Sequence, residues 1–208
     1  MVGIGITSYK RPEHLKLCLH QIGKHTDLSN VKLVIVEDVE GINNAKNQCL
    51  DRLKDCSDII LLDDDCFPIH DKWIEHILEA KINHLLYCIV SHAINKHIRD
   101  NIYSYWNCGG CLVYLSKAVL DGGFRYPENY QGYGFEHASL SWSIHTAGYT
   151  PYPYISLSDM GDYIYSLDYS GVGNFDIKHN PSKKYSEVID SVCYNSQLFK
   201  KQINENSL

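Results

Sequence analysis

The stretch Asp58–Pro68 constrains the fold more than any other part of the chain, because four apolar residues, Ile59–Leu62, run directly into three aspartates. A short apolar run bounded by turn-forming residues is typical of a strand that is buried on both faces of a sheet. Such a strand ends where its backbone reaches water, so we expect Asp63–Asp65 at its carboxyl end. Open α/β sheets bind their ligands at that edge. Pro68 follows closely and predicts the end of strand pairing.

The three adjacent carboxylates predict a site for a divalent cation. Like charges at this spacing repel one another unless a cation offsets the repulsion. Hard oxygen ligands suit Mg²⁺ or Mn²⁺, which keep positions open for water and for substrate phosphates. In an extended backbone Asp63 and Asp65 face one side of the strand and Asp64 faces the other. The alternative interpretation is an acidic surface turn without a ligand.

The first half of the chain alternates apolar and amphipathic segments. The expected strands are Val2–Thr7, Val31–Val36, Ile59–Leu62 and Leu85–Val90, and we expect the last three of them to be buried. The expected helices are Pro12–His25, Gly41–Leu53 with Asn43 or Asn44 as its cap, and a third helix capped by Asp71. This order predicts an α/β fold with a mainly parallel sheet flanked by helices. Polar or acidic residues follow three of the strands, at Thr7–Tyr9, Glu37–Asp38 and Asp63–Asp65. They should therefore meet at one edge of the sheet.

The second half predicts a smaller, mixed portion. Its expected elements are strands at Tyr103–Trp106 and Cys111–Leu115, a short helix capped by Ser116 and ending at Gly122-Gly123, a helix at Gly134–Gly148, an edge strand within Tyr149–Leu157, a substrate loop at Asp162–Asn180 and a partly helical tail at Lys183–Leu208. The 208 residues suit one domain with a sizeable core. We expect a single domain over residues 1–208.

Composition and charge narrow the class of protein. The net charge of −6 gives no support for a nucleic-acid partner. We see no apolar run near the ~20 residues that span a bilayer, and the amino terminus reads as a strand rather than a signal peptide. We therefore expect a soluble, cytoplasmic protein without a membrane span. The eight cysteines are expected to be reduced thiols, and Cys108–Cys111 to be packing residues rather than half of a zinc site.

Several segments, in this order, resemble the GT-A glycosyltransferases, especially the inverting family 2 type, over about residues 2–158. They are Val2–Pro12 as the first strand and nucleotide loop, Leu33–Asp38 as the second strand with its terminal acid, Gly41–Asn47, Asp63–Asp65 as a DxD motif, Gly109-Gly110 and Gly122–Phe124 on the acceptor side, and Gly134–Glu136 with the helix that carries the base. The resemblance implies a Rossmann-like nucleotide-sugar-binding half (about 1–100), an acceptor and catalytic half with a small antiparallel portion (about 101–180) and a tail (181–208).

The same segments are similar to the amino-terminal glycosyltransferase domains of algal-virus enzymes that decorate capsid glycans. That similarity implies a location in the host cytoplasm and allows further domains of a longer polypeptide. The GT-A resemblance itself implies a UDP-sugar donor, a glycan acceptor, transfer with inversion, and Mn²⁺ or Mg²⁺ as cofactor. It assigns the metal to Asp65 first, and Asp63 to the ribose or a metal-bound water. His179 is the candidate third ligand, although a solvated loop histidine explains it equally well.

The resemblance also implies the donor-binding residues. These are Thr7, Tyr9, Arg11, Asp38, Lys46, Asp63 and Asp64. A backbone group of Thr7 could read the uracil edge, Tyr9 could stack on the base, and Arg11 could pair with phosphate. Asp38 should accept a hydrogen bond from the base or ribose. Lys46 replaces an arginine of the family and could still neutralise phosphate. Ordinary polar loop and turn positions are the alternative for Tyr9, Arg11 and Asp38.

The catalytic base is expected at Glu136 or His137, where the family usually has Glu-Asp. An inverting transfer needs a base opposite the leaving group. Glu136, in the first turn of a helix, is kept anionic there, which weakens it as a base, while His137 has an ordinary pKa near neutrality. Of the two, Glu136 is the favoured base. Aromatic side chains could stack on sugar faces, and the candidates are Trp106, Tyr130, Tyr133 and Trp142, the last more typical of the core.

Two other functions remain open from the sequence. A sugar-phosphate nucleotidyltransferase is also a metal-dependent α/β enzyme, but it usually carries a glycine-rich basic loop after its first strand. The loop Ser8–Pro12 has no glycine, which argues against that enzyme. The other alternative is a non-catalytic glycan- or nucleotide-binding module that has lost its base at position 137. The sequence names neither the sugar nor the acceptor.

Overall fold

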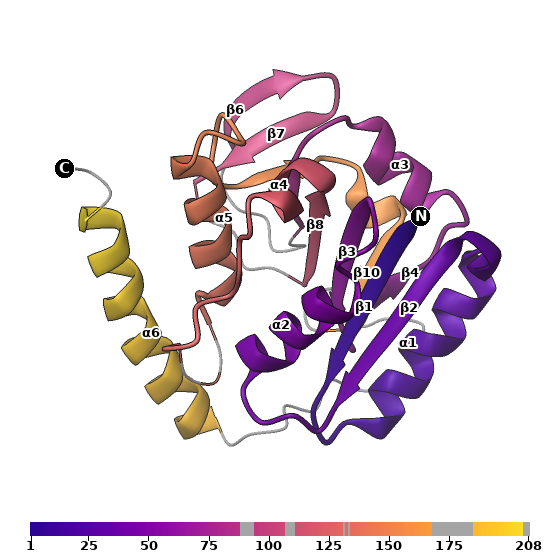
Figure 1. Ribbon diagram of the computed structural model, residues 1–208, viewed down its shortest axis with the longest axis horizontal. Coiled ribbons are helices and arrows are strands. Elements are labelled where there is room, and N and C mark those ends of the chain that lie inside the picture. The colour runs from indigo at the N-terminus through magenta and orange to yellow at the C-terminus, as the bar shows by residue number, and fades with distance from the viewer. Residues whose placement is uncertain (88–93, 107–110, 131, 133, 168–184, 206–208) are drawn as a thin grey trace.

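The computed structural model describes residues 1–87, 94–106, 111–130, 132, 134–167 and 185–205, with side chains of the last helix from residue 190. Its main sheet has the order β2-β1-β3-β8-β5 (Figure 1). The strands are β1 (Val2–Ser8), β2 (Val31–Glu37), β3 (Asp58–Asp63), β5 (His84–Tyr87) and β8 (Leu112–Ser116). β1 pairs in parallel with β2 and β3, whereas β8 runs antiparallel to β3 and β5. The predicted mainly parallel α/β sheet is confirmed, with one antiparallel strand inserted.

Helices cover both faces of this sheet (Figure 1). α1 (Pro12–His25) and α3 (Trp73–Glu79) bury their apolar side chains in one core cluster. α2 (Ile42–Arg52), α4 (Lys117–Asp121) and α5 (Glu136–Thr146) bury theirs in a second cluster on the opposite face. Two single 3₁₀ turns lie at Leu28–Asn30 and Met160–Asp162. The sheet is thus the middle of three layers.

Strand β3 contributes to both clusters, as its continuous apolar run predicts. Ile60 and Leu62 point into the first cluster, and Ile59 and Leu61 into the second. None of the four side chains is more than 2% exposed. The edge strand β2 is different, because most of its residues are only half-buried. The expectation that this strand is buried is wrong, since nothing pairs with its outer edge within the described sheet.

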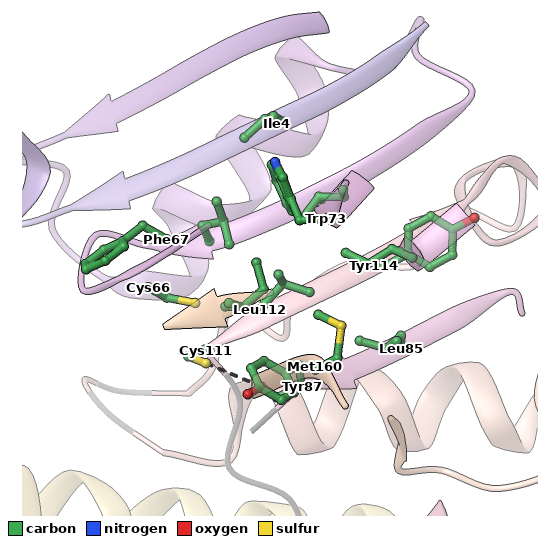
Figure 2. Close-up of a cluster of buried hydrophobic side chains, with 14 of the residues drawn as sticks. Ile4, Cys66, Phe67, Trp73, Leu85, Tyr87, Cys111, Leu112, Tyr114 and Met160 are labelled. Atoms are coloured by element: carbon green, nitrogen blue, oxygen red, sulfur yellow. Dashed lines mark hydrogen bonds between the residues drawn. The ribbon is translucent and has the colours of Figure 1, made fainter. Parts of the chain in front are cut away.

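Figure 2 shows part of the first cluster, in which Ile4 of β1, Trp73 of α3 and Leu112 of β8 come together. The Trp73 indole is fully buried, and its Nε1–H donates to the Thr26 hydroxyl at 3.0 Å. A buried tryptophan that keeps its polar atom satisfied anchors α3 against the sheet. Described cysteines at 18, 49, 56, 66, 111 and 193 are free thiols, and Cys111 is buried in this cluster, whereas Cys108 lies outside the described residues.

Two smaller sheets complete the described fold. β4 (Cys66–Pro68) pairs with β10 (Ile164–Ser166), and β7 (Ile102–Tyr105) lies between β6 (Ile94–Arg99) and β9 (Ile155–Leu157). Pro68 is the last residue of β4 and lies opposite Ile164. Strand β4 thus ends at Pro68, as expected, because a strand end tolerates the missing N–H of proline. β9 confirms an edge strand, but only over three residues.

Two predicted helix caps are also wrong. α2 begins after Gly41, whose φ of 86° puts it in a backbone region that favours glycine, and Asn43 and Asn44 lie inside the helix. α3 begins after Lys72. Asp71 instead contacts the Nδ1 of His25 at 2.6 Å. Ser116 does precede α4, but its hydroxyl donates to the Asn83 side chain and accepts no hydrogen bond from the helix.

The carboxyl-terminal segment forms one long helix, α6 (Tyr185–Glu205), instead of the partly helical tail expected from the sequence. α6 runs beside α5 (Figure 1). Phe199 lies against Phe135 and Trp142, with ring centroids 5.5 Å and 6.3 Å apart, and Gln202 accepts a hydrogen bond from Ser139 at 2.6 Å. Within the described ranges, no helix is both long enough and apolar enough to cross a membrane.

Candidate functional site

The candidate site lies at the carboxyl ends of β1 and β3. These strands are parallel neighbours, and Thr7 stands opposite Asp63 in their register. The Thr7 hydroxyl donates to an Asp63 oxygen at 3.3 Å. β3 ends at Asp63, and Asp64 and Asp65 form a turn before β4. The alternation expected for an extended backbone therefore stops at Asp63.

A cluster around Arg11 holds the two turn aspartates; we call Arg11, Ser8, Asp64 and Asp65 the Arg11 cluster. Nη1 of Arg11 contacts an Asp65 oxygen at 2.8 Å, and Nη2 pairs with Asp64. The Ser8 hydroxyl donates to the other Asp64 oxygen at 2.6 Å. Asp64 is 0% exposed and Asp65 4%. One guanidinium therefore serves two buried carboxylates.

Burial and charge oppose each other within the Arg11 cluster. Burial raises the pKa of Asp64 to about 7, although Arg11 and Ser8 act to lower it. Burial would lower the pKa of Arg11, but Asp65 and Asp64 outweigh it and raise that pKa above its ordinary value. Arg11 thus stays charged, and Asp64 can take up a proton near neutral pH.

A second group of side chains gathers around Lys46 of α2; we call Lys46, Asp63, Glu136, His137 and Tyr126 the Lys46 cluster. The Lys46 side chain is 1% exposed, and its Nζ lies 3.0 Å from Asp63 and 3.6 Å from Glu136. It also lies 2.5 Å from Nε2 of His137. The cluster joins α2, the end of β3 and the start of α5. It brings together four predicted site residues, Lys46, Asp63, Glu136 and His137, from three segments that are remote in the sequence.

The charges of this cluster fix the roles of its members. Burial would raise the pKa of Asp63, but the Lys46 ammonium opposes it and that pKa is held below its ordinary value. The Lys46 ammonium can only donate, so Nε2 of His137 accepts. Nδ1 of His137 then carries the proton and donates to the Tyr126 hydroxyl, 3.2 Å away. His137 is 4% exposed, and both of its ring nitrogens are engaged.

Close packing at Gly5 and hydrogen bonds from Asn47 position Lys46 and Tyr126 in the site. A Cβ on Gly5 of β1 would lie 2.6 Å from Leu61 and 2.9 Å from Cys49, so this glycine lets α2 pack closely on the sheet. The side-chain amide of Asn47 then binds the backbone of Tyr126 twice, with both distances 3.0 Å. Sequence reasoning missed Tyr126, because an aromatic residue in an irregular loop carries no pattern that links it to α2.

Glu136 is the first residue of α5, and the backbone before it is unusual. Gly134 has φ 94° and Phe135 φ 67°, both in the left-handed region. A Cβ on Gly134 would lie 2.9 Å from Val192 of α6. The turn places Glu136 at the positive end of the helix, which favours its carboxylate. Glu136 is 7% exposed.

The other predicted residues lie in varied surroundings. Asp38, after β2, accepts a hydrogen bond from the Lys10 backbone at 2.9 Å, and the Tyr9 ring lies 4.8 Å from the Lys10 ammonium. The exposed fractions are 69% for Trp106 and 9% for Tyr130, and Trp142 is half-buried against Phe199. The following predicted features lie outside the described residues: His179, Tyr133, Gly109-Gly110 and most of the loop 162–180.

The oxygens of Asp63, Asp64 and Asp65 suit a divalent cation, but in this structure they contact two positively charged side chains instead. Arg11 pairs with Asp64 and Asp65, and Lys46 pairs with Asp63. In the part of the chain that the structure describes, no three acidic, histidine or cysteine side chains are arranged around one metal position. The carboxylates could therefore ligate a metal once a guanidinium moves.

Comparisons with known proteins identify the fold. No protein-family model matches the sequence, and no curated protein sequence matches it either. Among solved structures, A197 from STIV aligns with a TM-score of 0.51 and 13% identity, over 89% of this chain and 100% of that one. A mutant Drosophila β1,4-galactosyltransferase 7 in complex with manganese, UDP-Gal and xylobiose aligns with a TM-score of 0.53 and 14% identity, over 88% and 82% of the two chains.

A glycosyltransferase involved in glycosylation of the major capsid of PBCV-1 also aligns, with a TM-score of 0.39 and 12% identity, over 72% of this chain and 71% of that one. That similarity is too weak to support any conclusion about this chain. At the identities found for the first two structures, the similarity shows the fold alone. The fold is that of the GT-A glycosyltransferases, as the sequence predicts.

Proposed function

We propose that the chain is a glycosyltransferase that moves a sugar from a nucleotide-diphosphate sugar, with UDP as the expected nucleotide, to a hydroxyl of a glycan with inversion. The observation that carries this proposal is the Lys46 cluster. It brings Asp63, at the ligand-binding edge of the sheet, into one ionic group with Glu136, the expected base. A donor-side carboxylate and an acceptor-side base in one group suit a displacement between two substrates.

The roles follow from the chemistry of an inverting transfer. The acceptor oxygen forms a bond to the anomeric carbon while the bond from that carbon to the diphosphate breaks, and the nucleoside diphosphate leaves with the electron pair. Glu136 takes the proton of the acceptor hydroxyl. His137 is the weaker candidate, because its two nitrogens contact Lys46 and Tyr126. Its role is to orient the Lys46 ammonium toward the two carboxylates.

Positive charge at this edge stabilises the leaving diphosphate. Arg11 has a fork geometry that suits phosphate oxygens. A bound divalent cation would add Lewis-acid stabilisation of the same group, with Asp65, Asp63 and His179 as its predicted ligands. Thr7, Tyr9 and Asp38 stay the predicted contacts of the nucleoside.

The first test is calorimetric titration with UDP and a panel of nucleotide sugars, followed by assays of donor turnover. Glu136→Gln should keep UDP affinity within about threefold and lower turnover by about 100-fold or more, the usual range for a lost general base. Glu128→Gln is the matched control, because Glu128 is an exposed acid in the loop before α5. It should change neither quantity.

The products separate the alternatives. A glycosyltransferase releases UDP from a UDP-sugar, whereas a nucleotidyltransferase supplied with pyrophosphate releases the sugar 1-phosphate and UTP. Nucleotide-sugar binding without turnover in the unmodified protein would favour a binding module. Unchanged turnover in Glu136→Gln would remove Glu136 as the base, and no binding of any nucleotide would overturn the proposed function.

A further inference from the structure

The Arg11 guanidinium lies beside Asp65, the first predicted ligand of the divalent cation, and beside the neighbouring Asp64. Both carboxylates are buried, and each already contacts the Arg11 guanidinium. The second Asp64 oxygen accepts the Ser8 hydroxyl. A metal that entered beside the guanidinium would meet a like charge in a poorly solvated place. Metal and guanidinium are therefore alternative partners of these carboxylates.

The Arg11 side chain can move away from its carboxylates more easily than the Lys46 side chain can. The Arg11 side chain is 13% exposed and extends from the loop between β1 and α1. The Lys46 side chain is 1% exposed and rises from within α2. A phosphate group offers a guanidinium two oxygens in the same planar geometry as a carboxylate. A nucleoside diphosphate at this edge of the sheet could thus draw Arg11 away from the aspartates.

We propose that Arg11 controls metal entry: its guanidinium, held by Asp64 and Asp65, competes with a divalent cation for Asp65, and a nucleoside diphosphate releases this competition by binding Arg11. This inference rests on the proposed function for the nature of the donor. Metal and nucleotide then bind with a coupling that passes through Arg11, and the coupling is reciprocal. The protein without nucleotide holds the metal weakly.

The direct test measures Mn²⁺ binding from the spectroscopic signal of free Mn²⁺, without nucleotide. Arg11→Met should bind Mn²⁺ about tenfold or more tightly than the unmodified protein, because a competing positive charge is gone. Lys10→Met is the matched control. It removes the same charge one residue away, where the ammonium lies over the Tyr9 ring and is exposed. Its Mn²⁺ affinity should stay within about threefold.

Arg11→Lys keeps the fold testable if the methionine variant does not fold. A lysine carries one compact charge and cannot hold both carboxylates in fork geometry, so this variant should also bind Mn²⁺ more tightly than the unmodified protein. Equal or weaker Mn²⁺ binding in the folded variants would overturn the inference. So would the absence of Mn²⁺ binding in all of the proteins.

A second titration separates this inference from the proposed function. Adding UDP should raise the Mn²⁺ affinity of the unmodified protein by a larger factor than that of Arg11→Met. UDP chelates metal through its own phosphates in both proteins, so the difference between the factors reports on Arg11. Equal factors would overturn the inference. Failure of every protein to bind UDP would instead overturn the proposed function, while the Mn²⁺ comparison would still stand.

Discussion

The Arg11 cluster and the Lys46 cluster lie at the same edge of the sheet, and in each of them one basic side chain serves two carboxylates. They differ in construction. Arg11 reaches Asp64 and Asp65, neighbours in one turn, from a loop. Lys46 joins Asp63 to Glu136 and links a strand to two helices. The first cluster is local to the sheet edge, whereas the second holds the two halves of the chain together.

The pKa values of the buried aspartates also differ between the two clusters. The pKa of Asp64 is raised by burial to about 7, so this carboxylate can become neutral near physiological pH. The pKa of Asp63 is held low, because the Lys46 ammonium opposes the effect of burial. The Arg11 cluster can thus lose its cation at modest cost. The Lys46 cluster cannot, and it is better suited to fix geometry than to bind a ligand that comes and goes.

Replacing the basic residue of each cluster in turn should give the largest difference in stability. Lys46→Met leaves Asp63 and Glu136 buried without their counterion, and breaking a buried ion pair in this way costs about 3 to 5 kcal/mol of unfolding free energy. Arg11→Met should cost less than about half of that, because Asp64 can take up a proton instead. Urea unfolding of both variants at neutral pH measures the difference. Equal losses would contradict the distinction between the clusters.

Another buried base, His84, sharpens the comparison because its hydrogen-bond partners are uncharged. Its Nδ1 contacts the Tyr114 carbonyl oxygen at 2.9 Å, and its Nε2 contacts the Ser141 hydroxyl at 2.7 Å. Burial lowers the pKa of His84 to about 4. The folded protein thus binds fewer protons here than the unfolded chain. The stability that neutral His84 contributes is present above pH 6.5 and is lost as the pH falls toward 4.

His84→Gln removes this titration. Full loss of the His84 contribution corresponds to about 3 kcal/mol, so the unmodified protein should lose more stability than the variant between pH 7.5 and 4.5. Asp64 acts in the opposite direction over part of this range, since its raised pKa makes the folded state gain a proton as the pH falls. Comparison of the two proteins cancels that effect. Parallel pH profiles in urea unfolding would contradict the assignment for His84.

The sequence predicted the fold best where one local pattern decides the structure. The apolar run Ile59–Leu62 is long enough to mark a strand buried on both faces, and the acids that follow mark its end. Strand β6 was missed, because its side chains are mostly polar and exposed and it forms by pairing with β7. The caps of α2 and α3 were wrong, since backbone conformation at Gly41 and a contact of Asp71 with His25 override side-chain preference.

For the site, the sequence named the charged residues but not their partners. The pattern after β1 and β3 places Arg11, Asp64 and Asp65 at one edge, yet it does not distinguish a guanidinium on phosphate from one on carboxylates. The pairing of Lys46 with His137 depends on how closely α2 packs on the sheet, which Gly5 allows. Tyr126 enters the site only because Asn47 binds its backbone. Contacts of this kind arise from packing and leave no periodic signal.

The smallest effects should come from single hydroxyls, one in each cluster. Ser8→Ala removes a buried hydrogen bond to a carboxylate at 2.6 Å, and such charge-assisted bonds contribute about 2 kcal/mol. Tyr126→Phe removes a hydroxyl 3.2 Å from Nδ1 of His137, and its loss should cost about 1 kcal/mol. In turnover the order should reverse, because Tyr126 helps to hold His137, and through it Lys46, beside the base. A larger loss of turnover in Ser8→Ala than in Tyr126→Phe would show that the Arg11 cluster, rather than the Lys46 cluster, limits the chemistry.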